Sequence, residues 1–116
     1  MRVIVTGSRK LADRTAAQVA LYDAIAALPV EATLIEGGAM GTDEKARIMA
    51  RRRGLDVETY WANWTRYDKG AGPIRNQKML SLGADLVLAF PGPESKGTWD
   101  MVRIAQEAGI KVEVLT

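Results

Sequence analysis

The sequence predicts an α/β protein with a Rossmann-like fold: a doubly wound parallel sheet of about five strands, with helices on both faces. Short β-branched or apolar runs alternate with segments of helical spacing, which is typical of parallel βαβ units with right-handed crossovers. Glycine follows several of the runs, as expected for the turns that join such elements. At 116 residues the chain is expected to form one domain, residues 1–116.

Each element has its own signal in the sequence. Five runs have the length and composition of strands: 3–5, 33–35, 57–61, 86–90 and 112–115. Four segments with apolar residues at helical spacing lie between them: 17–28, 46–50, 74–82 and 98–108. Pro73 is suited to a helix start, and Gly54, Gly83 and Gly109 are suited to helix ends. The stretch after the third strand is expected to be irregular.

The order of the strands decides where a ligand can bind. With the order 3-2-1-4-5, the topological switch point lies between the first and fourth strands, and ligands bind beyond the carboxyl ends there. This order places Gly7, Ser8 and Arg9 beside the loop 91–98, which reads PGPESKGT.

Composition excludes several kinds of chemistry. The chain has no cysteine and no histidine, which excludes disulfides, thiol catalysis, histidine acid–base catalysis and the usual zinc sites. We therefore expect no metal and no cofactor. No apolar run is long enough to span a bilayer, and the N-terminus enters a strand-like run without a signal peptide. A cytoplasmic protein with no membrane partner is expected.

Basic residues are concentrated in one segment, although the formal net charge is only +2. Lys45, Arg47 and residues 51–53 supply this concentration. Such a run is usually a solvated helix face, and nucleic acid is the less favoured interpretation.

Three loops after strands combine glycine with small hydroxyl residues: TGSR at 6–9, GGAMGTD at 37–43 and PGPESKGT at 91–98. Glycine lets backbone N–H groups approach a phosphate, and a following helix N-terminus adds partial positive charge. None of the loops is a Walker A or a GxGxxG motif. They predict a phosphorylated ligand, with these candidate binding residues: Gly7, Ser8, Arg9, Gly37, Gly38, Gly41, Thr42, Gly92, Gly97 and Thr98.

These motifs resemble those of the SLOG superfamily, which groups the lonely guy phosphoribohydrolases with the DNA-processing protein A family. PGPESKGT resembles the PGGxGT loop, GGAMGTD resembles the second glycine loop, and residues 75–79, RNQKM, resemble the RKxxM helix. The whole chain is similar to small bacterial and phage SLOG-like proteins. The resemblance implies a nucleotide or nucleotide-derived ligand and a homodimer formed through the helices near Arg75 and the aromatic segment.

The resemblance also implies roles for single residues. Gly97 and Thr98 would receive the phosphate, while Arg75, with Asn76 beside it, would approach from a neighbouring helix, because a guanidinium can bind two oxygens. The alternative for Arg75 is a surface salt bridge. Ser8 and Arg9 could equally be a turn-forming serine and a solvated arginine. Asp43 is expected to cap its helix rather than contact a sugar.

One departure from the family pattern concerns catalysis. In the phosphoribohydrolases the loop continues as PGGxGTxxE, and that glutamate serves cleavage of the N-glycosidic bond, but this chain has Met101 there. Asp100 lies one residue early, about 100° around a helix, and is expected to point elsewhere. Asp100 and Glu36 are the carboxylates left as catalytic candidates. The loop is also longer, and Lys96 is either a phosphate contact or a solvated loop tip.

The segment 59–67, TYWANWTRY, holds four of the chain's aromatic residues. Burial against the sheet edge or a dimer contact is favoured, and base stacking comes second. The sequence as a whole predicts a nucleotide-binding protein. The alternatives are a nucleoside monophosphate phosphoribohydrolase or related N-glycosidase and a single-stranded DNA-binding module.

Overall fold

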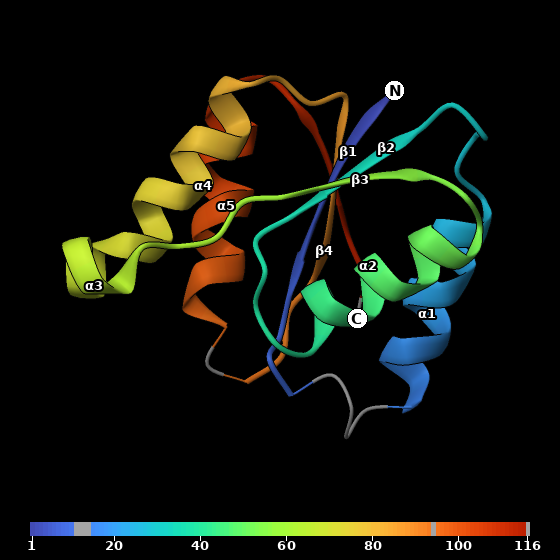
Figure 1. Ribbon diagram of the computed structural model, residues 1–116, viewed down its shortest axis with the longest axis horizontal. Helices are drawn as coiled ribbons and strands as arrows, with labels where there is room; N and C mark the ends of the chain where they lie inside the picture. The colour runs from blue at the N-terminus through green and yellow to red at the C-terminus, as the bar shows by residue number, and fades with distance from the viewer. Residues whose placement is uncertain (11–14, 94, 116) are drawn as a thin grey trace.

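Parallel strands form one sheet in the computed structural model, which describes residues 1–10, 15–93 and 95–115 (Figure 1). Within these residues the sheet has five strands: β1 (Arg2–Gly7), β2 (Thr33–Glu36), β3 (Asp56–Thr59), β4 (Leu86–Phe90) and β5 (Lys111–Val114). Their order is β3-β2-β1-β4-β5, and every pair is parallel, as predicted. All of β4 is buried, which explains its continuous apolar composition, because a central parallel strand is covered on both faces.

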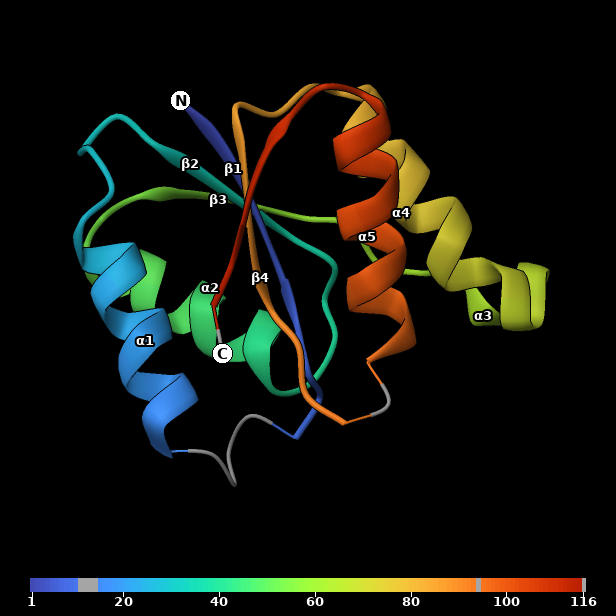
Figure 2. The same ribbon diagram turned by 180° about the vertical axis from the view of Figure 1, so that it is seen from behind.

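Helices cover both faces of the sheet (Figures 1 and 2). On one face α1 (Thr15–Ala26) and α2 (Thr42–Arg52) pack on a core that includes Val3, Val5 and Leu34. On the other face α4 (Ala71–Ser81) and α5 (Lys96–Glu107) pack on a core that includes Ile4, Ile35 and Val87. Successive β1 residues thus face opposite cores, as strand geometry requires. The Rossmann-like, doubly wound fold is confirmed.

Several boundaries differ from the predictions, and two of these differences concern the chain between β3 and α4. β3 ends at Thr59 rather than at Trp61, and a short helix, α3 (Trp64–Tyr67), and a 3₁₀ turn, η2 (Asp68–Gly70), follow in the stretch expected to be irregular. α4 begins at Ala71 and not at Ile74. Pro73 is therefore the third helical residue, which is tolerated because first-turn N–H groups have no partner within a helix.

The predicted switch point is confirmed by the strand register. Gly7 at the end of β1 pairs with Phe90 at the end of β4, and the Ser8 N–H donates to the Phe90 carbonyl at 3.0 Å. The chain diverges after these two residues because α1 and α5 return on opposite faces of the sheet. The TGSR and PGPESKGT loops thus leave the sheet side by side.

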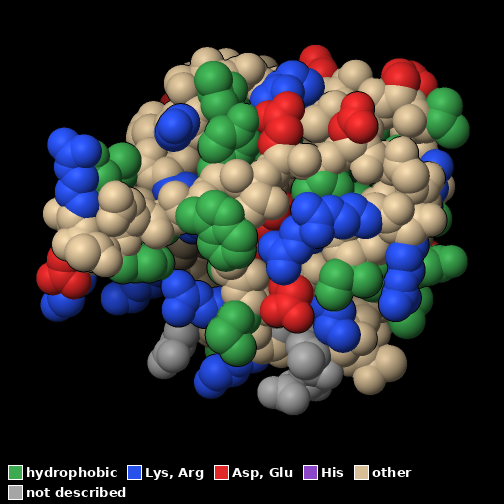
Figure 3. Space-filling view, viewed as in Figure 1, with side chains coloured by type: hydrophobic (Ala, Val, Ile, Leu, Met, Phe, Trp, Pro, Cys, Tyr) green, Lys and Arg blue, Asp and Glu red, His purple; other side chains and the backbone are tan. Residues whose placement is uncertain are grey.

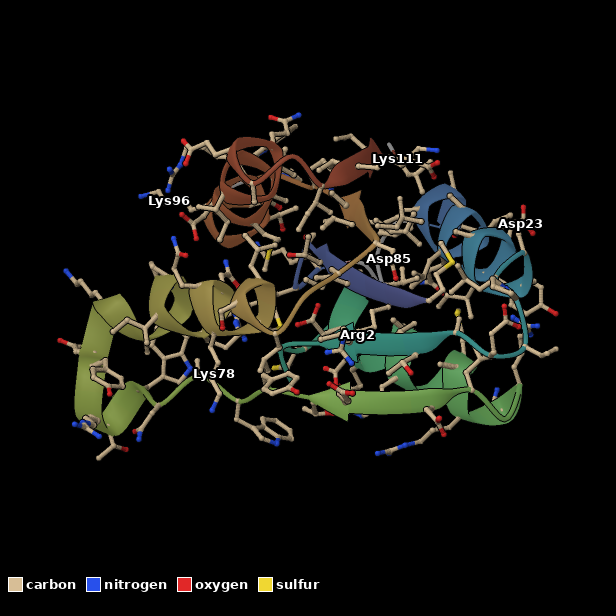
Figure 4. The ribbon with its side chains drawn as sticks, turned by 90° about the horizontal axis from the view of Figure 1, so that it is seen from above. Arg2, Asp23, Lys78, Asp85, Lys96 and Lys111 are labelled. Atoms are coloured by element: carbon tan, nitrogen blue, oxygen red, sulfur yellow. The ribbon has the colours of Figure 1, made fainter. Side chains whose placement is uncertain are left out.

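At the opposite edge of the sheet, Arg2 connects β1 with β3 and with the residue before β4 (Figure 4). Its N–H donates to the Asp85 carboxylate at 2.7 Å, and its guanidinium forms an ion pair with Glu58 at 2.8 Å. The hydrogen bonds from Arg2 and Tyr60 lower the pKa of Glu58 to about 2. Among the described residues, no helix is long and apolar enough to cross a membrane.

Candidate functional site

A cavity of about 630 Å³ opens at the carboxyl end of β1, between the start of α5 and the chain from α3 to α4. Figure 3 shows Lys and Arg side chains on this side of the molecule, below and beside α3. The residues lining it come from five separate segments: Thr6, Gly7, Ser8, Arg9, Lys10, Ala39, Asp43, Trp64, Lys69, Pro73, Arg75, Pro93, Ser95, Lys96, Gly97, Thr98 and Asp100. The cavity therefore lies at the switch point, where the sequence places the ligand.

The first turn of α5 forms one wall of this cavity. Lys96, Gly97 and Thr98 are its first three residues and all line the cavity. In any helix the N–H groups of the first turn have no partner within the helix, and the dipole favours an anion there. A Cβ added to Gly97 would have no other heavy atom within 4 Å. Packing therefore does not require glycine at 97, and the space above it belongs to the cavity.

The loop before α5 is fixed by a local hydrogen bond. The Ser95 hydroxyl accepts from the Gly92 N–H at 2.7 Å, as small hydroxyl residues commonly do in turns. Gly92 itself is not among the described residues that line the cavity. Gly92 instead binds Ser95, the residue that directly precedes α5.

Residues of the second glycine loop hold the first loop in place. The Ser8 carbonyl accepts from both the N–H and the hydroxyl of Thr42, at 3.0 and 2.9 Å. A Cβ on Gly7 would lie 2.5 Å from the Thr42 hydroxyl oxygen, and one on Gly41 would collide with the Arg9 carbonyl. Gly41 also has a φ of +75°, a conformation that favours glycine. Gly41 and Thr42 thus support the first loop and are not among the described residues that line the cavity. Gly7, Ser8 and Arg9 of the first loop do line it.

Gly37 and Gly38 are held by buried charged side chains. The Asp43 carboxylate accepts from the N–H groups of Gly37 and Ala39 at 3.1 and 3.3 Å, and Glu36 accepts from Gly38 at 2.6 Å. The Arg75 guanidinium donates to the Gly37 carbonyl at 2.5 Å. Neither glycine is among the described cavity-lining residues. The backbone of Gly37 links the side chains of Asp43 and Arg75, and that of Gly38 binds Glu36.

The expectation that Asp43 caps its own helix is wrong. The N-cap of α2 is Gly41, and no side chain makes a capping hydrogen bond there. Asp43 is the second helical residue, and its carboxylate turns back to the glycine loop because the N–H groups of Gly37 and Ala39 lie within reach. Burial, with the nearby Glu36 carboxylate, raises the pKa of Asp43 to about 7, although Arg75 opposes this.

Arg75 is half-buried and lines the cavity, so it is not a residue of a surface salt bridge. Its Nη1 donates to Gly37 and its Nε donates to the Asn76 side-chain oxygen at 3.0 Å. Burial lowers the pKa of Arg75, and the positive charge of Arg9 acts in the same direction. A guanidinium remains charged despite such shifts. The structure thus presents a fixed, partly dehydrated cation to the cavity.

Asn76 is buried and joins α4 to the start of α5. Its amide nitrogen donates to the Gly97 carbonyl at 3.2 Å and to the Asp100 carboxylate at 3.1 Å. Asn76 does not itself appear among the described residues lining the cavity. The sequence singles it out next to Arg75, and the structure places it behind Arg75 and Gly97, where it fixes both.

The helical-phase argument against Asp100 is wrong, because Asp100 lines the cavity. α5 is helical from Lys96 onward, and Asp100 lies three residues after Gly97 and four after Lys96, which places all three on one face. Met101 is fully buried in the core under α4 and α5. A glutamate at 101 would bury a carboxylate in this core, so Met101→Glu is expected to destabilise the fold rather than to complete a catalytic site.

The charge of the cavity favours anions. Of the residues that the structure describes, five cations line it, namely Arg9, Lys10, Lys69, Arg75 and Lys96, together with the carboxylates Asp43 and Asp100. Asp100 also forms an ion pair with Arg103 at 3.0 Å. The remaining excess of positive charge within one concave surface raises the local concentration of anionic ligands.

Comparison with known proteins gives the family. The sequence profile of the YspA, cpYpsA-related SLOG family matches residues 1–67, more than half of the chain. The chain belongs to this family. The SLOG chain is also 42% identical over 116 residues to the Gene 61 protein of Mycobacterium phage D29, covering 96% of this chain and 93% of that protein.

A solved structure shares the fold of this SLOG protein. It is that of DNA processing protein A from Streptococcus pneumoniae, with a TM-score of 0.56 and 17% identity over 97% of this chain. This SLOG chain spans 58% of that protein's chain. At this level of identity the likeness concerns the fold alone.

In the aromatic segment of this SLOG protein, Tyr60 packs on the core, whereas the two tryptophans are exposed. Trp61 is 69% exposed and Trp64 is 50% exposed, because the chain leaves the sheet after β3 and α3 projects away from it (Figure 1). Trp61 lies over Gly38, and Trp64 lines the cavity. The sequence favours burial or a dimer contact for this segment, with base stacking second, and has no signal that singles out Trp64 within it.

Lys10, Lys69 and Pro73 of the SLOG cavity also lie outside the motifs. Lys69 follows α3 in the short 3₁₀ turn η2, where no sequence pattern points to a ligand. Only the path of the chain between β3 and α4 brings it to the site. Lys10 directly follows the TGSR loop, and that adjacency is the signal that could have found it.

The basic segment of the SLOG chain is partly used for structure. Arg47 pairs with the buried Glu36 at 3.4 Å, and Arg53 donates to the Ile25 and Leu28 carbonyls at the end of α1. These two side chains are therefore less available to nucleic acid than the sequence suggests. The described residues contain no cluster of carboxylates that could hold a metal ion.

Proposed function

We propose that this protein binds a nucleotide or a nucleotide-derived phosphorylated ligand in the cavity at the carboxyl edge of its sheet. The observation that carries the proposal is the wall formed by Lys96, Gly97 and Thr98, where the first turn of α5 opens on a cavity whose described lining includes five cations. Membership of the SLOG family supports a nucleotide-related ligand. The cavity volume, about 630 Å³, is in the range of small-molecule sites.

In this proposal the phosphate lies against the first turn of α5. Gly97 adds no side chain over the helix N-terminus, and its Cα faces open space. Arg75 supplies a charge-assisted hydrogen bond from α4, and Asn76 holds Arg75 and the Gly97 carbonyl in a fixed relation. A preorganised donor set of this kind loses little entropy when the anion binds.

A thermal-shift screen with nucleotides, cyclic nucleotides and ADP-ribose derivatives tests the proposal. A ligand present at a hundred times its dissociation constant is expected to stabilise the protein by about 2.7 kcal/mol. No stabilisation by any phosphorylated compound of the screen would contradict nucleotide binding.

Calorimetry on Arg75→Ala then tests the site. The variant is expected to bind the screened nucleotide about 1.5–3 kcal/mol more weakly, the range for hydrogen bonds to charged groups. The control is Lys78→Ala, because Lys78 is an exposed residue of the same helix and projects away from Lys96 (Figure 4). Equal affinity of both variants would exclude Arg75 from the site.

A second candidate is hydrolysis of the N-glycosidic bond of a nucleoside monophosphate. The observation that favours it is the Asp100 carboxylate in the cavity wall, because cleavage through an oxocarbenium-like state needs a carboxylate near the sugar. Asp100 is held by Asn76 and Arg103, so we expect base release to be absent or slow. Efficient release of free base that is lost in Asp100→Asn would establish the hydrolase instead.

We also propose that the protein is a homodimer. Trp61, Tyr67 and Ile74 are exposed on the segment from the end of β3 to α4, and none of them is among the described residues that line the cavity. Contiguous apolar surface is uncommon on monomers and is typical of protein interfaces. The resemblance to the phosphoribohydrolases supports this proposal, because it implies a dimer contact at the aromatic segment and the helix that carries Arg75.

A further inference from the structure

Trp64 is the only aromatic residue among the described residues that line the cavity. It is the first residue of α3, and the turn is fixed by Asn63, whose side-chain oxygen accepts from the Arg66 N–H at 3.0 Å. Half of the Trp64 surface is exposed. The ring is thus held on a defined backbone and is still accessible to a ligand.

Two neighbours of the ring are Gly72 on α4 and Arg9 after β1. A Cβ on Gly72 would lie 3.6 Å from the Trp64 ring, so the backbone of α4 supports the ring at one edge. The Arg9 guanidinium carbon lies 5.9 Å from the ring centroid, near the outer limit of a cation–π contact of about 6 Å. Closely packed carbon atoms lie about 3.5–4 Å apart. Arg9 is therefore near the ring without packing tightly on it.

The same cavity combines this aromatic surface with positive charge. Lys10, Lys69, Arg75 and Lys96 line it together with Trp64 and Arg9. A ligand that uses both features must carry a flat aromatic group and an anionic group. A sugar phosphate without a base satisfies only the charged part of the cavity.

We propose that Trp64 is the base-binding residue of the cavity, and that the ligand is a nucleoside phosphate whose base stacks on the Trp64 ring. Arg9 lies at the same subsite and adds a cation beside the stacked base. This inference rests on the proposed nucleotide-binding function and deepens it, because it separates nucleoside phosphates from sugar phosphates.

Calorimetry with AMP, GMP, CMP, UMP and ribose 5-phosphate tests the inference on the natural protein, Trp64→Ala and Trp64→Phe. Stacking of one base on an aromatic side chain corresponds to roughly a 5- to 150-fold change in affinity. Trp64→Ala is expected to lower affinity for the tightest monophosphate by such a factor and to leave ribose 5-phosphate binding unchanged. Trp64→Phe keeps an aromatic face and is expected to retain most of the affinity.

Trp99→Ala is the matched control. Trp99 is also 50% exposed and lies on α5, but it is not among the described residues that line the cavity. Unchanged monophosphate affinity in Trp64→Ala, or an equal loss for ribose 5-phosphate, would overturn the base-binding role and leave nucleotide binding intact. If the natural protein binds none of the four monophosphates, this inference fails, whereas the proposed function fails only if no phosphorylated compound of the thermal-shift screen binds.

Discussion

At the scale of single residues, two glycines of the loops serve different purposes. Gly41 has a φ of +75° and sits against the Arg9 carbonyl, where any side chain would collide. Gly97 has open space on its Cβ side, and that space is the cavity. Glycine at 41 is thus required by the fold, and glycine at 97 leaves room for a ligand.

Substituting these glycines is expected to separate stability from binding. Gly41→Ala should lower the free energy of unfolding by about 1–3 kcal/mol, because a strained φ and a steric collision combine there. Gly97→Val should stay folded with a similar melting temperature and lose binding of phosphorylated ligands. Urea unfolding and calorimetry measure the two effects.

Gly54→Ala is the control for backbone strain alone, since Gly54 has a φ of +76° and no neighbour within 4 Å of a Cβ. It is expected to cost less than Gly41→Ala. Normal ligand binding by Gly97→Val would mean that residue 97 serves only the turn.

The buried carboxylate Asp43 is expected to make stability depend on pH. Its pKa is raised to about 7 from 3.8, so between about pH 4 and 7 the folded protein holds a proton that the unfolded chain has released. Stability therefore falls as pH rises through this window, by up to about 1.4 kcal/mol per pH unit, and levels off above it. Asp43→Asn keeps an oxygen for Gly37 and Ala39 and should flatten this slope.

Urea unfolding of the natural protein and Asp43→Asn between pH 4.5 and 8 measures the effect. Asp23→Asn is the control, because Asp23 is exposed on α1. The pKa of Glu58 is lowered to about 2, so its contribution to stability is lost as pH falls below about 4.5. This pH range lies below the range of the measurement, in which Asp43 titrates. An unchanged slope in Asp43→Asn would show that another group titrates.

At the scale of elements, the site depends on how α4 is joined to the start of α5. The connection is made by Asn76, which is buried and forms hydrogen bonds with Arg75, Gly97 and Asp100. No other residue type supplies an amide nitrogen and an oxygen on so short a side chain. The two helices are thereby fixed at the end that faces the cavity.

Asn76→Leu is expected to lower the free energy of unfolding by about 1–3 kcal/mol, because it leaves buried polar groups without partners. It should also weaken nucleotide binding, since Arg75 and residue 97 lose their fixed relation. The measurements are urea unfolding and calorimetry, with Gln77→Leu at the exposed neighbouring position as control. Equal stability of the two variants would show that the Asn76 hydrogen bonds do not stabilise the packing of α4 on α5.

At the scale of the whole molecule, the apolar surface from β3 to α4 is expected to hold two copies together. Light scattering at micromolar concentration should give the mass of a dimer, twice 12.6 kDa. Ile74→Glu should shift the mass toward the monomer, because it places a charge at an exposed apolar position of the proposed contact. A monomeric mass for the natural protein would refute the dimer.

The sequence alone determined the fold and which loops lie at the switch point, where the structure has its cavity. Buried parallel strands are apolar on both faces, so a run such as 86–90 can be identified as a strand from its own residues. Because strands alternate with helices, the connections are expected to be right-handed crossovers between parallel strands. The strand order makes β1 and β4 neighbours, and in the structure their last residues, Gly7 and Phe90, are paired. This is why the TGSR and PGPESKGT loops were placed together correctly.

Only the tertiary structure decided which loop residues face the cavity and which support it. Gly41, Thr42 and Asn76 make their contacts with segments far away in sequence, and no local pattern records such contacts. The same holds for Trp64 and Lys69, which reach the cavity because the chain after β3 crosses to α4 in that direction. Local sequence determines helices and strands through their periodicity, whereas the lining of a cavity depends on the packing of all of them together.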